Sequence, residues 1–138
     1  MLSPVRRCVL SSLGLLSVSL LFSGSLAAAE PRQCDPQWHN TMSLDDGKLE
    51  LGLGGETFSV RSDGRLYFGV HPVKLNEQQM EVLANYHQMM LDDLPYTLSH
   101  NQHIDDEFCQ RVAARQIKEN EIQSLIPALK RWQSVTLD

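Results

Sequence analysis

Residues 48–70 read KLELGLGGETFSVRSDGRLYFGV, and this stretch decides the fold. Apolar and polar residues alternate in three short runs, which is the period of a β-strand with one buried face. Gly54-Gly55 and Asp63-Gly64 separate the runs, and both pairs favour tight hairpin turns. We therefore predict an antiparallel β-meander with one apolar face, which another element has to cover.

The segment after the meander supplies this cover. Val73–Leu75 is expected to add a short fourth strand, and a helix is expected over 77–93. Asn76 and Gln79 form a capping box at its start. Pro95 is expected to end the helix, because the residue before a proline avoids the helical conformation. The stripe predicted to face the sheet consists of Met80, Leu83, Ala84, His87, Leu91 and Leu94.

Two more helical stretches follow in the sequence. The first is expected to begin near Asn101, with Asn101 as its N-cap, and the second covers 119–132, where Pro127 should kink or split it. Together these patterns predict an α+β fold. Its core is a small antiparallel β-meander of three to four strands covered by two to three helices.

The N-terminus has the features of a secretory signal peptide. Arg6 and Arg7 precede an apolar run of about fifteen residues, and small residues with the A-x-A pattern end at Ala29. The run is shorter than the roughly 20 apolar residues of a transmembrane helix. We expect residues 1–29 to be a cleaved signal peptide and residues 30–138 to be a single mature domain. Its expected parts are an extended arm with little regular structure (30–47), the meander (48–75) and a helical part (76–138).

Charge and cysteine content restrict the function classes. Removal of residues 1–29 leaves ten basic and seventeen acidic residues, a net charge of −7, which argues against nucleic-acid binding. Cys8 leaves with the signal peptide, so Cys34 and Cys109 remain. An even number of cysteines in an oxidising compartment predicts one disulfide. Two free thiols are the alternative, but no CxxC motif favours it.

No motif predicts catalysis or a cofactor. The sequence lacks GxSxG, P-loop and HExxH patterns, and its carboxylate pairs are sequence neighbours that point apart. Val82, Tyr86 and Met89 form a second apolar stripe on the helix over 77–93. This stripe is interpreted as packing against a later helix, with a partner-binding surface as the alternative.

The stretch HNQHIDDEFC, residues 100–109, contains the best metal-ligand candidates. These are His100, His103 and Glu107, of which the last two would share a face of a helix that begins near Asn101. Their spacing matches no known zinc pattern. A helix start explains more residues, because the acidic residues then stabilise the first turn and Glu107 can pair with Arg111. No metal is therefore predicted.

The order of these features resembles that of the YggN-like family of periplasmic proteins of unknown function. The resemblance lies in Cys34, the strand–SDG–strand unit, FGVHPVKLNEQQMEVLANYHQMMLDDLPY and FCQRVAARQ. It covers residues 48–96 and a short block around Cys109. The family members carry an extended helical region between the blocks, which residues 97–107 replace here. The resemblance implies an envelope location and supports the disulfide, but it supplies no catalytic residue.

These observations favour a non-catalytic periplasmic envelope protein. We expect it to bind another envelope protein as an accessory factor, a chaperone or an inhibitor, without binding nucleic acid and without spanning the membrane after processing. The alternative is a metal or small-ligand binding protein that uses His100 and His103. A hydrolase is the third candidate.

Overall fold

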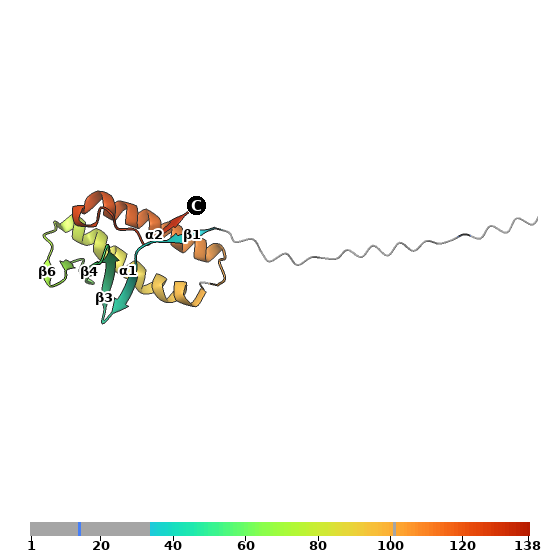
Figure 1. The fold of residues 1–138 in the computed structure, drawn as a ribbon, viewed down its shortest axis with the longest axis horizontal. Helices are drawn as coiled ribbons and strands as arrows, with labels where there is room; N and C mark the ends of the chain where they lie inside the picture. Colours follow the sequence, from blue (N-terminus) through green and yellow to red (C-terminus); the bar gives the residue numbers. More distant parts are fainter. Residues whose placement is uncertain (1–13, 15–33, 101) are drawn as a thin grey trace, which may run out of the picture. The chain divides into compact units, whose positions relative to one another are not determined.

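The computed structural model describes residue 14, residues 34–100 and residues 102–138. The expected signal peptide therefore lies outside the described residues, except for residue 14. From residue 34 onward, the described residues belong to one compact unit of α+β architecture, as predicted (Figure 1).

The predicted meander is part of a five-stranded antiparallel sheet whose strands follow one another in sequence order. The strands are β2 (Met42–Asp45), β3 (Lys48–Leu53), β4 (Glu56–Val60), β5 (Leu66–Phe68) and β6 (His71–Pro72). Leu49 pairs with Val60 and Leu51 with Phe58, so the alternating apolar residues share one buried face. The fourth strand of the meander is His71–Pro72, not the expected Val73–Leu75.

The expected arm contains two strands, so the prediction of little regular structure over 30–47 is wrong. β2 joins β3 through a two-residue turn, in which Asp46 and Gly47 have φ values of 49° and 75°. β1 (Pro36–Trp38) pairs with β7 (Val135–Leu137) in a separate two-stranded sheet. A strand of three residues is too short to show a recognisable alternation in the sequence. Its pairing partner, β7, lies at the other end of the chain, so no hairpin signal indicates it either.

Helix α1 (Glu77–His100) begins as predicted but ends later. The capping box is present: Gln79 N–H donates to Asn76 Oδ1 over 2.8 Å, and Asn76 N–H donates to Gln79 Oε1 over 2.9 Å. The helix continues through Pro95, so its predicted end near residue 93 is wrong. Proline removes one helical hydrogen bond. Contacts that the residues after Pro95 make with α2, described below, offset this loss.

Helix α2 (Asp106–Leu125) replaces two predicted helical stretches, because no helix breaker lies between them. Its N-cap is Asp105, which accepts a hydrogen bond from Phe108 N–H over 2.9 Å, so the predicted start near Asn101 is wrong. The chain leaves the helix before Pro127, as predicted, and forms the short 3-10 helix η1 (Pro127–Leu129).

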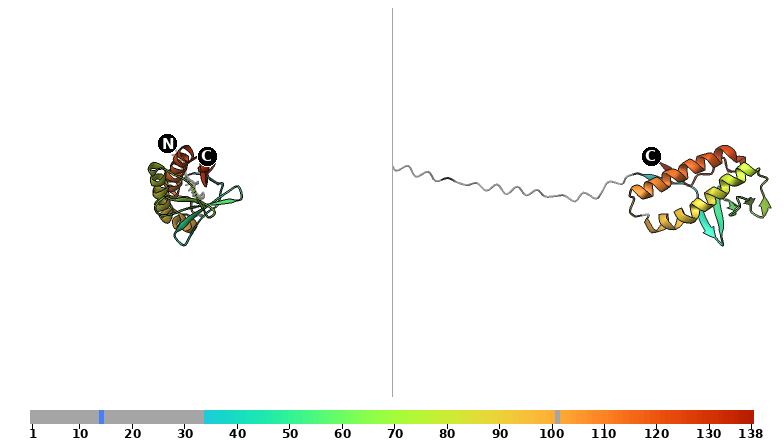
Figure 2. Two further views of the ribbon diagram at one scale, coloured as in Figure 1. Left: turned by 90° about the vertical axis from the view of Figure 1, so that its left-hand side faces the viewer. Right: turned by 180° about the vertical axis from the view of Figure 1, so that it is seen from behind.

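The two helices lie side by side and antiparallel, and α1 packs between α2 and the sheet (Figures 1 and 2). The segment after α2 returns to the same core, where Ile126, Leu129 and Trp132 are fully buried. One side of α1 is polar, and its residues are all exposed: Gln78, Glu81, Asn85, Gln88 and Asp92. Leu91, predicted to face the sheet, is exposed as well.

Candidate functional site

An apolar groove lies between strand β2 and the C-terminal half of α1, and we call it the β2–α1 groove. It is lined by Met42, Ser43, Leu44, Leu94, Pro95 and Leu98. Its volume is about 500 Å³, within the range of about 300–1,000 Å³ that is common for ligand sites. Leu98 is 76% exposed, so most of its side chain faces solvent at this end of the groove.

A second hollow of about 230 Å³ continues the apolar surface beyond Leu98 toward β1. It is lined by Pro36, Trp38, Thr97, Leu98, Ile104 and Phe108. Trp38 is half-exposed, and its ring packs edge-on against Phe108 with 6.5 Å between the ring centroids. Because Leu98 lines both hollows, the exposed apolar surface is continuous from β2 to β1.

Two side chains of α1 hold the strand that forms one wall of the β2–α1 groove. His87 is buried, and its Nε2 lies 2.7 Å from the carbonyl oxygen of Gly47, in the turn that follows β2. The hydroxyl group of Tyr86 lies 3.8 Å from Met42 Sδ, at the start of β2. The strand is therefore tied to α1 near both of its ends. His87 belongs to the stripe of α1 that was predicted to face the sheet, and its burial agrees with that prediction.

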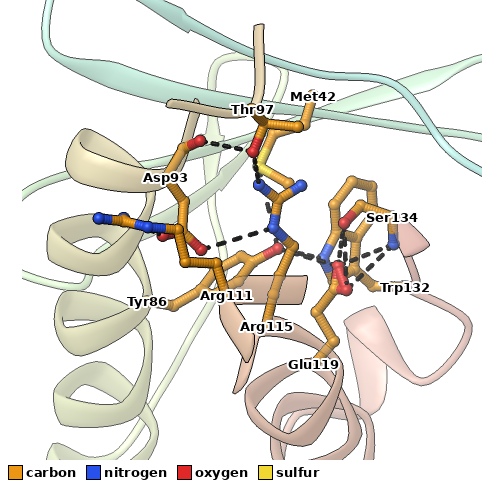
Figure 3. Close-up of polar contacts among 9 residues, drawn as sticks. All are labelled: Met42, Tyr86, Asp93, Thr97, Arg111, Arg115, Glu119, Trp132 and Ser134. Atoms are coloured by element: carbon orange, nitrogen blue, oxygen red, sulfur yellow. Dashed lines mark hydrogen bonds and ion pairs between the residues drawn. The ribbon is translucent and has the colours of Figure 1, made fainter. Parts of the chain in front are cut away.

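A buried polar network lies behind this wall (Figure 3). Trp132 Nε1–H donates to the hydroxyl oxygen of Tyr86 over 3.1 Å, and the Tyr86 hydroxyl donates to Glu119 over 3.2 Å. Ser134 donates to the same carboxyl group through its backbone N–H, over 2.8 Å, and through its hydroxyl. Tyr86 and Glu119 are 0% exposed. A substrate cannot reach groups that are closed off in this way, so the network is structural.

Burial changes the acidity of two groups in the network. Desolvation raises the pKa of Glu119 above 4.5, although the hydrogen bonds from Ser134 and the charge of Arg115 act in the opposite direction. Desolvation also raises the pKa of Tyr86 well above 10.0, and the nearby carboxyl group of Glu119 adds to this rise. Both pKa values are raised because burial in the core disfavours the charged forms of the two side chains.

The network continues along the interface of α1 and α2, where it holds the helical wall of the groove. Asp93 Oδ1 accepts from Arg111 Nη1 over 3.0 Å, and Asp93 Oδ2 lies 3.8 Å from Arg115 Nε. Arg115 Nη2 donates to Thr97 Oγ1 over 3.1 Å, and Thr97 in turn donates to the Asp93 carbonyl over 2.6 Å. Asp93 and Thr97 thus fix the last turns of α1. Leu98, which follows Thr97, lies in these turns and lines the groove.

The sequence contains a signal for these buried charges that our sequence analysis missed. Arg115 and Glu119 continue the apolar stripe of α2 at helical spacing, between Val112 and Ile122. A charged pair on the buried face of a helix predicts a partner on the facing helix. Asp93 is that partner, although in the sequence it is only one of two adjacent acidic residues.

The stripe of Val82, Tyr86 and Met89 packs inside the chain. Val82 and Tyr86 are buried and Met89 is partly buried, which is what the packing interpretation predicts. The alternative of a partner surface on this stripe is wrong. The exposed apolar surface lies on another side of α1, at Pro95 and Leu98.

The predicted disulfide between Cys34 and Cys109 is present, with 5.9 Å between the Cα atoms. It ties the residues before β1 to the first turn of α2. Because α2 also contacts β7, the disulfide and the β1–β7 pairing hold the same corner of the fold.

The three metal-ligand candidates do not form one site. The ring of His100 stacks on Tyr96 with 4.0 Å between ring centroids, and Glu107 pairs with Arg111 over 3.2 Å, as predicted. His103 lies in the connection before α2, so it shares no helical face with Glu107. Among the described residues, no group of three or more His, Cys, Asp or Glu side chains is placed to hold a metal ion.

Comparisons with protein-family models, with curated proteins and with solved structures found no match for this chain. In the part of the chain that the structure describes, no helix combines the length and the apolar character needed to cross a membrane.

Proposed function

We propose that this protein is a non-catalytic binding protein of the periplasm, whose β2–α1 groove takes an apolar segment of another envelope protein. The observation that carries the proposal is the groove itself. The groove has a volume of about 500 Å³ and a mostly apolar lining that ends at the exposed Leu98, so apolar side chains of a partner can pack into it.

The residues around the groove support a rigid binding site. Side chains from α1 tie β2 near both ends, and the buried charges at Asp93 and Arg115 hold the other wall. A preorganised site loses less conformational entropy on binding than a mobile one. This arrangement suits an accessory factor, a chaperone or an inhibitor that holds a segment of its partner without acting on it chemically.

The periplasmic location and the membership of the YggN-like family are parts of the same proposal. Residues 1–29 carry the charge, length and small residues of a cleaved signal peptide, and the Cys34–Cys109 disulfide suits an oxidising compartment. The family resemblance depends on the order of the sequence features quoted above. N-terminal sequencing of the exported protein tests the location, and Glu30 is the expected first residue.

Site-specific cross-linking tests the binding site in cells. A photoreactive amino acid at position 98 lies in the groove, whereas one at position 117 is a matched control, because Ile117 is an exposed apolar residue of α2 (69% exposed). We expect a discrete cross-linked protein from position 98 and none from position 117.

The captured protein is then purified and its affinity measured by calorimetry. We expect Leu98→Asp to weaken binding by about tenfold or more and Ile117→Asp to leave it unchanged, since a few buried apolar residues usually carry most of the binding energy. Equal cross-linking from both positions, or an unchanged affinity of Leu98→Asp, would contradict the proposal.

A further inference from the structure

Strand β2 is an open edge of the five-stranded sheet. The β2–β3 hairpin closes on the Asp45–Lys48 pair, and Gly52 N–H donates to the carbonyl oxygen of Thr41 over 2.9 Å. Backbone groups of an antiparallel pair alternate in direction, so Met42 and Leu44 direct their N–H and C=O groups away from β3. Among the described residues, no backbone hydrogen bond outside the sheet ladders uses these groups.

This open edge borders the β2–α1 groove. The side chains of Met42 and Leu44 lie on the core face of the sheet, where Leu94 packs against the same core. A strand added beside β2 would lie over the groove. Its residues opposite Met42 and Leu44 would place their side chains against Leu94 and Leu98, because paired residues share a face of the sheet.

The opposite edge of the sheet is blocked. β6 has two residues and ends at Pro72, which has no backbone N–H. Very short edge strands and prolines are common means of preventing edge pairing. β2 is longer and contains no proline, so only one of the two edges can accept a strand.

The charges near β2 select among the occupants of this edge. On the outer face, Asp45 and the adjacent Asp46 are exposed, and Glu50 lies opposite Ser43. Lys48 lies opposite Asp45 and offsets part of this negative charge. A second copy of the chain would bring like charges together, whereas basic residues on an added strand would complement them.

We propose that the partner binds by strand addition, as an extended segment that pairs antiparallel with β2. Its apolar residues hydrogen-bond to Met42 and Leu44 and fill the groove, and alternating basic residues lie on the outer face beside Asp45. This inference rests on the proposed function and adds the binding mode and the chemistry of the partner.

The probe is a synthetic peptide of about eight residues in which valine and lysine alternate, a length typical of a strand. It is titrated into the exported, disulfide-bonded protein, which is labelled with ¹⁵N. We expect binding, slower exchange of the Met42 and Leu44 amide protons, and a loss of affinity of about tenfold or more in Leu98→Asp but not in Ile117→Asp. Replacement of the lysines by glutamates should weaken binding.

Two methylated peptides supply the matched control. N-methyl groups on the valines remove the donors that face β2, whereas N-methyl groups on the lysines point away from it. We expect about a tenfold or greater loss with the first peptide and little change with the second. Equal affinities of the two methylated peptides, or unprotected Met42 and Leu44 amides, would overturn strand addition.

The remaining outcomes separate this inference from the proposed function. Absence of peptide binding overturns the strand chemistry, while the cross-linking at position 98 still decides whether the groove has a partner. A protein that is dimeric alone, with Met42 and Leu44 amides already protected, shows that the occupant is a second copy, and this also overturns the inference.

Discussion

At Glu119, a carboxyl group lies in the centre of the core and accepts hydrogen bonds from Ser134 and Tyr86. The cost of burying a charge is reduced in two ways: the donors satisfy its oxygens, and burial raises its pKa. Tyr86 connects this group to Trp132 on one side and to Met42 on the other. One buried residue thus links both helices to the strand that borders the groove.

The titration of Glu119 predicts a pH dependence of stability. The pKa is 4.5 in the unfolded chain and higher in the folded protein, so proton binding favours folding. This stabilisation is fully present below pH 4.5 and is lost as the pH rises through the folded-state pKa. In Glu119→Gln the group does not titrate. We therefore expect the free energy of unfolding of the wild type, relative to this variant, to fall as the pH rises from 4.5 toward neutrality.

Urea unfolding at a series of pH values measures this difference. The control is Glu81→Gln, because Glu81 is exposed on α1 and has no ion-pair partner among the described residues. Its difference from the wild type should show no comparable change. A pH-independent difference between wild type and Glu119→Gln would contradict the argument.

At the scale of the element, the last turns of α1 are held by contacts with α2. Pro95 weakens the helix at this point, yet the chain remains helical to His100. Arg111 lies over the ring of Tyr96, 4.2 Å from its centroid, and Arg115 bonds to Thr97. Asp93 in turn holds the guanidinium groups of Arg111 and Arg115 in place.

Two variants at adjacent residues, Asp93→Ala and Asp92→Ala, test whether the end of α1 depends on the contacts with α2. Asp93→Ala leaves the buried guanidinium of Arg115 without its carboxylate, so we expect a loss of about 3 kcal/mol or more in stability and faster amide exchange over Tyr96–His100. Asp92 is exposed, and its replacement should change stability by less than about 0.5 kcal/mol. Chemical denaturation and hydrogen exchange measure both effects. Similar results for the two variants would rule out this role of Asp93.

At the scale of the whole molecule, the described part of the chain is closed by contacts between its two ends. β1 pairs with β7, and the disulfide joins Cys34 to Cys109 across a sequence separation of 75 residues. A cross-link over a loop of this length removes much conformational freedom from the unfolded chain. The corner that it holds carries Trp38, at the far end of the exposed apolar surface.

Reduction should therefore lower the free energy of unfolding by roughly 4 kcal/mol on the loop-entropy model. Urea unfolding with and without a reductant measures the change, and a Cys34→Ser, Cys109→Ser double variant should match the reduced protein. Intact mass after alkylation checks the bond itself. Two alkylated thiols in the unreduced native protein would show that it is absent.

The sequence by itself determined the features that depend on neighbouring residues. Period-2 alternation and glycine turns define the meander, Asn76 and Gln79 define the start of α1, and Pro127 marks the end of α2. The disulfide followed from the count of cysteines. Each of these signals is local, or rests on composition, and needs no knowledge of which elements meet.

Only the tertiary structure decided the features that depend on distant contacts. The continuation of α1 past Pro95, the pairing of β1 with β7 and the buried cluster of Asp93, Arg115 and Glu119 all need partners far away in the sequence. The β2–α1 groove belongs to the same group. Its walls come from residues about fifty positions apart in the sequence, so no local pattern indicates that they meet. Local preferences are weak compared with the free energy of packing, so the final fold overrides them where the two disagree.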